Sequence, residues 1–151
     1  MMIGKKEING RYYIHSYLNS SPRQRNVYIE FMVDSSQRYT TISKSDAEKN
    51  NVDLQTLQIA KAMFEVRNEK VDAYVIPNCV INIPNQSGRP NYSITLPRVH
   101  VPFSKISTSS LEPDFSRLGL DFLEKFSIEF HTIGEVDRDQ IMILQDKKSS
   151  Q

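Results

Sequence analysis

The chain has 151 residues, of which 25% are charged and 38% hydrophobic, and its formal net charge is +1. This length suits one domain with a single core, and the small net charge excludes a strong field for attracting nucleic acid or an anionic membrane. No stretch approaches the ~20 apolar residues of a membrane span, and no signal peptide is recognisable, so we expect a cytoplasmic protein without membrane or nucleic-acid partners. The single cysteine, Cys79, excludes an internal disulfide and is interpreted as a small buried hydrophobe.

Two β-rich runs near the N-terminus, residues 12–18 and 27–33, predict a hairpin with one buried face. Every second residue of the later run is apolar: Val27, Ile29, Phe31 and Val33. The basic cluster between the runs, residues 23–25, is interpreted as part of a loop rather than as a phosphate-binding patch. Residues 34–37 break the pattern, and the β-branched residues within 39–43 predict another short strand.

A helix start follows, because Ser45 and Glu48 have the spacing of a capping box. We expect this helix to end near residues 50–51. Residues 53–62 are ambiguous, since the spacing of Leu54, Leu57 and Lys61 allows a helix. Charged residues around Asn68 then separate two apolar runs, which is the pattern of a hairpin with an exposed tip.

The second half of the chain is punctuated by prolines, which predict short separate strands at residues 80–83, 92–96 and 99–101. A helix is expected over residues 118–126, capped by Asp114 or Ser116, with one apolar face formed by Leu118, Phe122, Leu123 and Phe126. Two further strands are expected at residues 127–131 and 140–144, joined by a turn near Gly134. The domain is therefore predicted to span residues 1–144, and residues 145–151 to form a disordered polar tail.

The sequence lacks the motifs of several common sites. His15, His100 and His131 are dispersed, so we expect no metal site and interpret each as a solvated or locally bonded imidazole. The serines form no nucleophile elbow, and no glycine motif suited to phosphate binding is present. No glycine occurs between Gly10 and Gly88. We therefore expect no cofactor.

The stretch that begins at Asp34, "DSSQRYTTISKSDAEKNNVDL", resembles without a gap the catalytic strand, loop and first helix of retropepsin-like aspartic peptidases of the single-domain cellular type. A second stretch, "RLGLDFLEKFSIEF", is similar to the late segment of that family that packs beneath the catalytic loop. Between them, "FEVRNEKVDAYVIP" looks like the hairpin that forms the flap over the substrate. The resemblance covers residues 12–144, nearly the whole chain.

The resemblance implies a mostly β protein, a small closed β-barrel of the retropepsin type with one or two short helices, in which the later part of residues 53–62 is a strand. It implies a homodimer, because one chain supplies one catalytic aspartate, and a peptide or protein substrate. The catalytic loop would be Asp34, Ser35 and Ser36, with Asp34 of each subunit activating a water and the Ser35 hydroxyl linking the two loops.

Other residues take roles from the same resemblance. Arg67, Asn68 and Glu69 would contact the substrate from the flap, and Leu118, Gly119 and Asp121 would support the active site. Asp121 is expected at the first turn of a helix, where its charge complements the dipole, so an intramolecular pair with Asp34 is not favoured.

The sequence departs from the family in two places. Ser36 stands where the family has glycine, and the flap contains no glycine. An inactive relative that serves as a dimerisation or peptide-binding module is therefore the alternative hypothesis. A third reading, a small β-rich binding domain with chance similarity, predicts a monomer.

Overall fold

The structure is a computed structural model that describes residues 2–6, 11–20, 27–66, 68–84, 92–106, 114–132 and 140–146. The described strands are β1 (Met2–Lys6), β2 (Tyr12–Ser20), β3 (Val27–Val33), β4 (Gln58–Val66), β5 (Glu69–Ile83), β6 (Tyr92–Pro102), β7 (Ser116–Leu118), β8 (Phe126–Thr132) and β9 (Gln140–Asp146). The helical elements are α1 (Lys44–Lys49), the 3-10 turn η1 (Leu54–Thr56) and α2 (Leu120–Leu123). None of these helices is long and apolar enough to cross a membrane.

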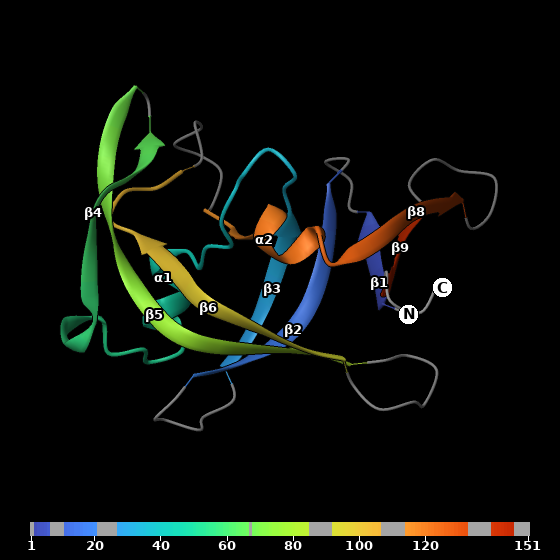
Figure 1. Ribbon diagram of the computed structural model, residues 1–151, viewed down its shortest axis with the longest axis horizontal. Helices are drawn as coiled ribbons and strands as arrows, with labels where there is room; N and C mark the ends of the chain where they lie inside the picture. The colour runs from blue at the N-terminus through green and yellow to red at the C-terminus, as the bar shows by residue number, and fades with distance from the viewer. Residues whose placement is uncertain are drawn as a thin grey trace.

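The strands form one sheet in the order β4-β5-β2-β1-β9-β8, with β6 paired to β5, and β3 paired to β2 and β7. The prediction of a closed barrel is wrong, because within the described part of the chain the sheet does not close. Strands β1 and β2 share only the pairs Lys5↔Tyr13 and Lys6↔Tyr12. Strands β1, β8 and β9 therefore extend away from the rest of the sheet, at the opposite end of the molecule from β4 (Figure 1).

The predicted N-terminal hairpin is confirmed: β2 and β3 are antiparallel, with Ile14 opposite Phe31. Ile29 and Phe31 are buried, whereas Tyr28 and Glu30 on the other face are exposed. The hairpin with its tip near Asn68 is also confirmed as β4 and β5. At this tip Asn68 has φ 65°, a left-handed conformation that asparagine tolerates better than most residues, so the turn forms without glycine.

Helix α1 begins earlier than predicted. The expected capping box at Ser45 is wrong, because Ser43 caps the helix and its side chain accepts a hydrogen bond of 3.0 Å from the backbone N–H of Asp46. Ser43 is extended, with φ −63° and ψ 147°, which is the backbone conformation of an N-cap residue, while Ser45 lies inside the helix. The helix ends at Lys49 with Asn50 as its C-cap, close to the expected end at residues 50–51.

The expected helix over residues 118–126 is shorter in the structure, where α2 is a single turn capped by Gly119 rather than by Asp114 or Ser116. Its first predicted residue belongs to β7 and its last to β8, because backbone pairing to β3 and β9 takes those positions. The apolar face survives this change, since the four residues predicted to share it are all buried: Leu118, Phe122, Leu123 and Phe126.

The prolines do not divide the second half into short strands as predicted, because β5 and β6 run through them. Pro77 lies where β5 changes neighbour: β4 pairs with it up to Val75, and β2 pairs with it from Cys79. On that side of β5, Pro77 falls between the β4 and β2 ladders, and on the other side it lies opposite Arg98 of β6. Pro97 and Pro102 lie in β6, whose strand partner in the sheet is β5 alone, so an edge position accommodates them.

Several smaller expectations also change. The strand expected over residues 39–43 is wrong, since Thr41 forms only isolated bridges, to His100 and Arg117. The ambiguous segment 53–62 contains η1 and then β4. Strand β9 extends to Asp146, so the first two residues of the expected tail belong to the sheet, and residues 147–151 lie outside the described part. The loop at residues 23–25 and the turn near Gly134 also lie outside it.

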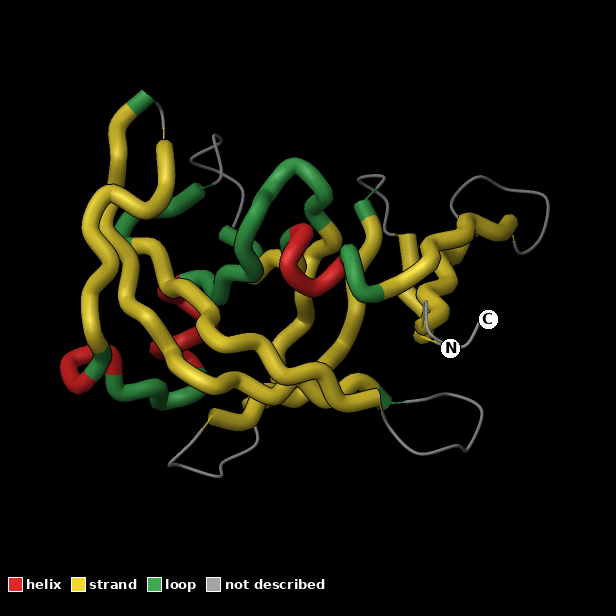
Figure 2. The backbone as a smooth tube through the Cα atoms, viewed as in Figure 1, coloured by secondary structure: helices red, strands yellow, loops and turns green. Residues whose placement is uncertain are grey.

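The main core consists of buried side chains from the hairpins and the helices, and Figure 2 shows the backbones of these elements. Its largest fully buried side chains include one from each of several elements: Ile14 of β2, Phe31 of β3, Ile81 of β5, Leu96 of β6 and Phe122 of α2. Ala47 of α1 belongs to the same cluster. This core fixes β3, β7 and α2 against one another, and the loop after β3 is held between them.

Candidate active site

The loop after β3 presents Asp34 at the point where β3 meets β7. Strands β3 and β7 are parallel, and the backbone N–H of Asp34 donates to the carbonyl of Leu118 at 3.0 Å. A turn follows, closed by the N–H of Gln37 donating to the carbonyl of Asp34. Asp34 is half-buried, and Ser35 and Ser36 are exposed.

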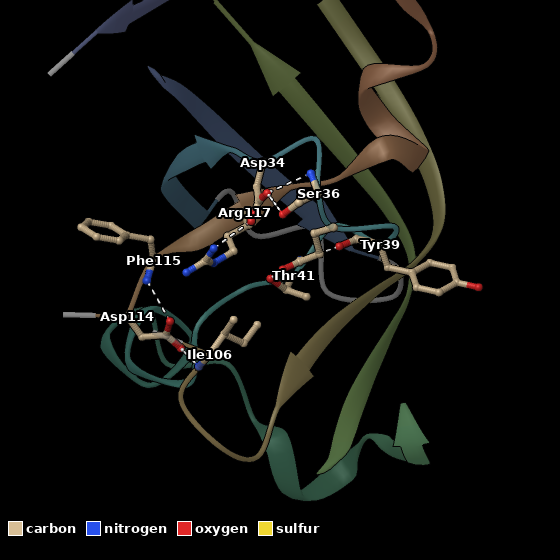
Figure 3. Close-up of polar contacts among 9 residues, drawn as sticks. Asp34, Ser36, Tyr39, Thr41, Ile106, Asp114, Phe115 and Arg117 are labelled. Carbon is tan, nitrogen blue, oxygen red and sulfur yellow. Dashed lines mark hydrogen bonds and ion pairs between the residues drawn. The ribbon is translucent and has the colours of Figure 1, made fainter. Parts of the chain in front are cut away.

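The carboxylate of Asp34 accepts hydrogen bonds from two residues of its own chain (Figure 3). Oδ1 accepts from the backbone N–H of Ser36 at 3.0 Å and from its hydroxyl at 2.5 Å. Oδ2 accepts from Nη1 of Arg117 at 2.7 Å, an ion pair whose side chains are 15% and 12% exposed, respectively. Both carboxylate oxygens therefore have donors within one subunit.

These contacts control the ionisation of Asp34. Burial alone would raise the pKa of its carboxyl, but the hydrogen bonds from Ser36 and Arg117 and the charge of Arg117 outweigh burial and hold the pKa below 3.8. Asp34 is accordingly an anion at neutral pH.

Ser36 replaces the family's glycine without backbone strain. The described non-glycine residues with a positive φ are Asn51, Ala62, Asn68 and Asn78, and Ser36 is not among them. Its N–H and hydroxyl both donate to Oδ1 of Asp34. The bond from the N–H makes residues 34–36 an Asx turn. The serine side chain is therefore part of the carboxylate's own hydrogen-bonding shell.

Gly119 and Asp121 hold the loop from beneath. A Cβ on Gly119 would lie 2.7 Å from the carbonyl carbon and oxygen of Tyr39 and 2.8 Å from the oxygen of Gln37. The backbone N–H of the next residue, Leu120, donates to this same Gln37 oxygen at 2.8 Å. Asp121 accepts from the N–H of Thr40 at 3.0 Å and from its hydroxyl at 2.7 Å. The carboxylate of Asp121 therefore binds the backbone and side chain of Thr40 in the loop rather than pairing with Asp34.

A cleft of about 420 Å³ lies over this loop. Its lining comes from the loop, from β4, from β7 and from Ile106, and includes Asp34, Tyr39, Met63, Phe64, Glu65 and Arg117. The β4–β5 hairpin therefore borders the same cleft as Asp34. This is the position that the resemblance implies for a flap.

The hairpin residues that line the cleft differ from those named from the sequence. Met63, Phe64 and Glu65 do so, whereas Glu69 lines a separate hollow of about 190 Å³ with Val71 and Lys105. Asn68 lines neither of these two spaces, and Arg67 lies outside the described residues. The lining residues Met63, Phe64 and Glu65 lie at and just after the bulge in β4 between Ala60 and Phe64, upstream of the tip.

His100 lies behind the cleft and was misread from the sequence. It is fully buried, and neither ring nitrogen has a hydrogen-bond partner. Its ring packs edge-on against Tyr39 and Phe64, with centroids 5.3 and 5.5 Å away. Burial, and secondarily the charge of Arg98, lowers the pKa of His100 below 6.5, while Asp121 opposes this. His100 therefore joins the Asp34 loop to the hairpin as a neutral ring.

The remaining chemically reactive residues lie away from this site. His15 bonds to Tyr28 on the surface, and the side chain of His131 lies outside the described part of the chain. Cys79 is buried, its thiol donates to the carbonyl of Ile76, and burial raises its pKa to about 12. Among the described residues no group of three or more His, Cys, Asp or Glu side chains could hold a metal ion.

Arg117 is the site residue that sequence reasoning missed. It directly precedes Leu118 in the segment assigned to active-site support, so a parallel pairing of this segment with β3 would have placed it beside Asp34. The pairing brings together residues that are 83 positions apart, which no local pattern reveals.

No family model and no curated protein matches the chain. Among solved structures, it is similar to a retropepsin-like aspartic protease from Rickettsia conorii, with 24% identity over 95% of this chain and 88% of that chain, and a TM-score of 0.59. Identity at this level bears on the fold alone. The chain therefore has the fold of the retropepsin-like aspartic proteases, as the resemblance in its sequence implies.

Proposed function

We propose that the protein is a retropepsin-like aspartic endopeptidase that acts as a homodimer and needs no cofactor. The observation that carries the proposal is the position of Asp34, which lines a cleft bordered by Met63, Phe64 and Glu65 of the hairpin. A carboxylate between a rigid loop and a hairpin has the arrangement needed to hold a peptide against a catalytic group. The likeness to a named aspartic protease supports the fold on which the proposal rests.

In the proposed reaction, Asp34 of each subunit meets its twin at a twofold axis, and the two carboxylates share one proton. The ionised Asp34 takes a proton from a water molecule, whose oxygen attacks the carbonyl carbon of the substrate. The protonated Asp34 gives its proton to the carbonyl oxygen. The carboxyl that took the proton from water then gives it to the amide nitrogen, and the C–N bond breaks. Ser35, exposed beside Asp34, would link the two loops across the axis, and the hairpin would close over the peptide.

A second candidate is a peptide-binding or dimerisation module without hydrolytic activity. The ion pair between Asp34 and Arg117 favours it, because an aspartate that accepts bonds on both oxygens from its own subunit is a weak base. Both candidates use the same cleft, so they differ in turnover and not in binding.

The test combines assembly and turnover. We expect sedimentation to give a dimer, and the wild-type protein to cleave members of a mixed peptide library, with products identified by mass spectrometry. Asp34→Asn should lower kcat/KM at least about a thousandfold while keeping the dimer, because the amide can neither take the proton from water nor share one with its twin.

Glu48→Gln, an equal change of charge at an exposed position on α1, is the control and should retain wild-type activity. Cleavage that persists in purified Asp34→Asn would rule out the peptidase assignment. Peptide binding without cleavage from pH 3 to pH 8 would instead establish the binding module, and a monomer would contradict the homodimeric peptidase.

A further inference from the structure

The Asp34–Arg117 ion pair poses a chemical problem for the proposed reaction, on which this inference rests. Two carboxylates at a twofold axis repel each other unless something neutralises one charge, and in an aspartic dyad that is a shared proton. Here each Asp34 already has a cation, Arg117, whose Nη1 is 2.7 Å from Oδ2. With both arginines in place, a dimer would carry two ionised carboxylates and no proton to deliver to the substrate carbonyl.

The contact also occupies the carboxylate sterically. Oδ1 faces the N–H and hydroxyl of Ser36, and Oδ2 faces the guanidinium, which comes from β7 beside the loop (Figure 3). Arg117 itself lines the cleft. A water or a substrate carbonyl that approaches Oδ2 from the cleft therefore competes with Arg117.

The ion pair is not fully satisfied. Nε of Arg117 is buried and has no hydrogen-bond partner, although Nη1 is well paired. A buried donor without an acceptor destabilises the arrangement that contains it. Without the ion pair to Asp34, the guanidinium is therefore less stable in this position than in one where Nε finds an acceptor.

We infer that Arg117 is an autoinhibitory latch: it pairs with Asp34 in the resting subunit and must release the carboxylate before the dyad can form. Protonation of Asp34 breaks the ion pair, so acid opens the latch. The other charged side chains lining the cleft are Arg38 and Glu65, one of each sign, and neither is paired with Asp34. Arg117 acts through Asp34 and is a positioning residue rather than a catalytic one.

The test removes the guanidinium and follows Asp34 directly. In Arg117→Gln, the Asp34 carboxyl should titrate at higher pH than in the wild type, measured by NMR with carbon-13 labelling of aspartate carboxyls and assigned with Asp34→Asn. The alkaline limb of kcat/KM should move up by the same amount, because the dyad keeps its proton to higher pH. Above that limb, Arg117→Gln should be faster than the wild type by about tenfold for each pH unit of the shift.

Two further variants make the result specific. Arg117→Lys keeps the charge and should retain part of the lowering of the Asp34 pKa. Arg98→Gln removes an exposed arginine that lies on β6 and is not among the cleft-lining residues, and should leave the titration of Asp34 and the activity profile unchanged.

The outcomes separate the latch from the proposed function. Hydrolysis by the wild type with an unmoved alkaline limb in Arg117→Gln, or an unmoved Asp34 titration, overturns the latch and leaves the peptidase standing. No hydrolysis by folded, dimeric wild type or Arg117→Gln at any pH overturns the peptidase, and the latch with it.

Discussion

Replacing Gly119 with alanine should show how tightly the loop that carries Asp34 is supported. The added Cβ would lie 2.7 Å from the carbonyl carbon and oxygen of Tyr39, far inside the 3.4 Å at which ordinary contacts begin. Every atom that it meets is backbone, so no side chain can rotate away, and the loop or α2 has to move. Overpacking of this kind costs about 1–3 kcal/mol.

The displacement also strains two hydrogen bonds between the same segments. The N–H of Leu120 donates to Gln37 at 2.8 Å, and the N–H of Asp121 donates to Arg38 at 3.1 Å. Each is worth about 0.5–1.5 kcal/mol, so the total loss of stability should be about 2–6 kcal/mol. For a domain of this size the melting temperature should then fall by roughly 4–24 °C.

Urea unfolding of Gly119→Ala, followed by circular dichroism, measures this loss. It should be repeated at several protein concentrations, because dimerisation would contribute to apparent stability. Glu124→Ala, at an exposed position just after α2, should stay within about 0.5 kcal/mol of wild type. If the free energy of unfolding of Gly119→Ala also stays within about 0.5 kcal/mol of wild type, the loop can move without cost. The close approach of Gly119 would then not hold Asp34 in place.

Two further changes test the contacts around the hairpin. Because the folded state keeps His100 neutral while the unfolded chain takes up a proton below pH 6.5, this group should reduce stability as the pH falls through 6.5 and make no such contribution above it. His100→Leu should therefore flatten the loss of stability in urea between about pH 7 and about pH 5, and an unchanged slope would contradict the assignment. Asp72→Ala should speed amide exchange at Ala62 in the β4 bulge, because Asp72 accepts the N–H of Ala62 at 2.9 Å; exchange at the wild-type rate would show that the bulge holds without it.

The sequence predicted best the elements whose burial follows a local period. Residues 27–31 alternate because Ile29 and Phe31 face the core, although Met32 on the other face is also buried. The charged residues around Asn68 interrupt two apolar runs because they form the end of a hairpin. In both places the side-chain pattern alone records which residues face the interior, so no knowledge of distant partners was needed.

Elements that depend on a distant partner were predicted less well. Strand β1 was not foreseen, and its longest pairing is with β9, at the other end of the chain. Pro77 was taken to interrupt a strand, whereas β5 passes through it at the point where its neighbour changes from β4 to β2. The closed barrel was wrong for the same reason, since closure depends on how the two ends of the sheet meet and not on any one strand.

The residues of the candidate site show the same difference between what a local pattern predicts and what depends on distant partners. Asp34, Gly119 and Asp121 could be named from the sequence because they belong to motifs that resemble a known family, and the structure brings all three to one loop. His100 could not, because an alternating strand gives no sign that a histidine is buried without a hydrogen-bond partner.

Arg117 shows why the fold by itself does not decide the chemistry of this loop. The backbone around Asp34 is fixed by the N–H of Asp34 donating to Leu118 and by the buried supports beneath it, and none of these contacts involves a guanidinium. The same backbone can therefore carry an aspartate that shares a proton with its twin or one that is neutralised by its own subunit. In this structure the Arg117 guanidinium, 2.7 Å from Oδ2, neutralises Asp34 within its own subunit. A comparison of folds therefore does not decide between the two arrangements.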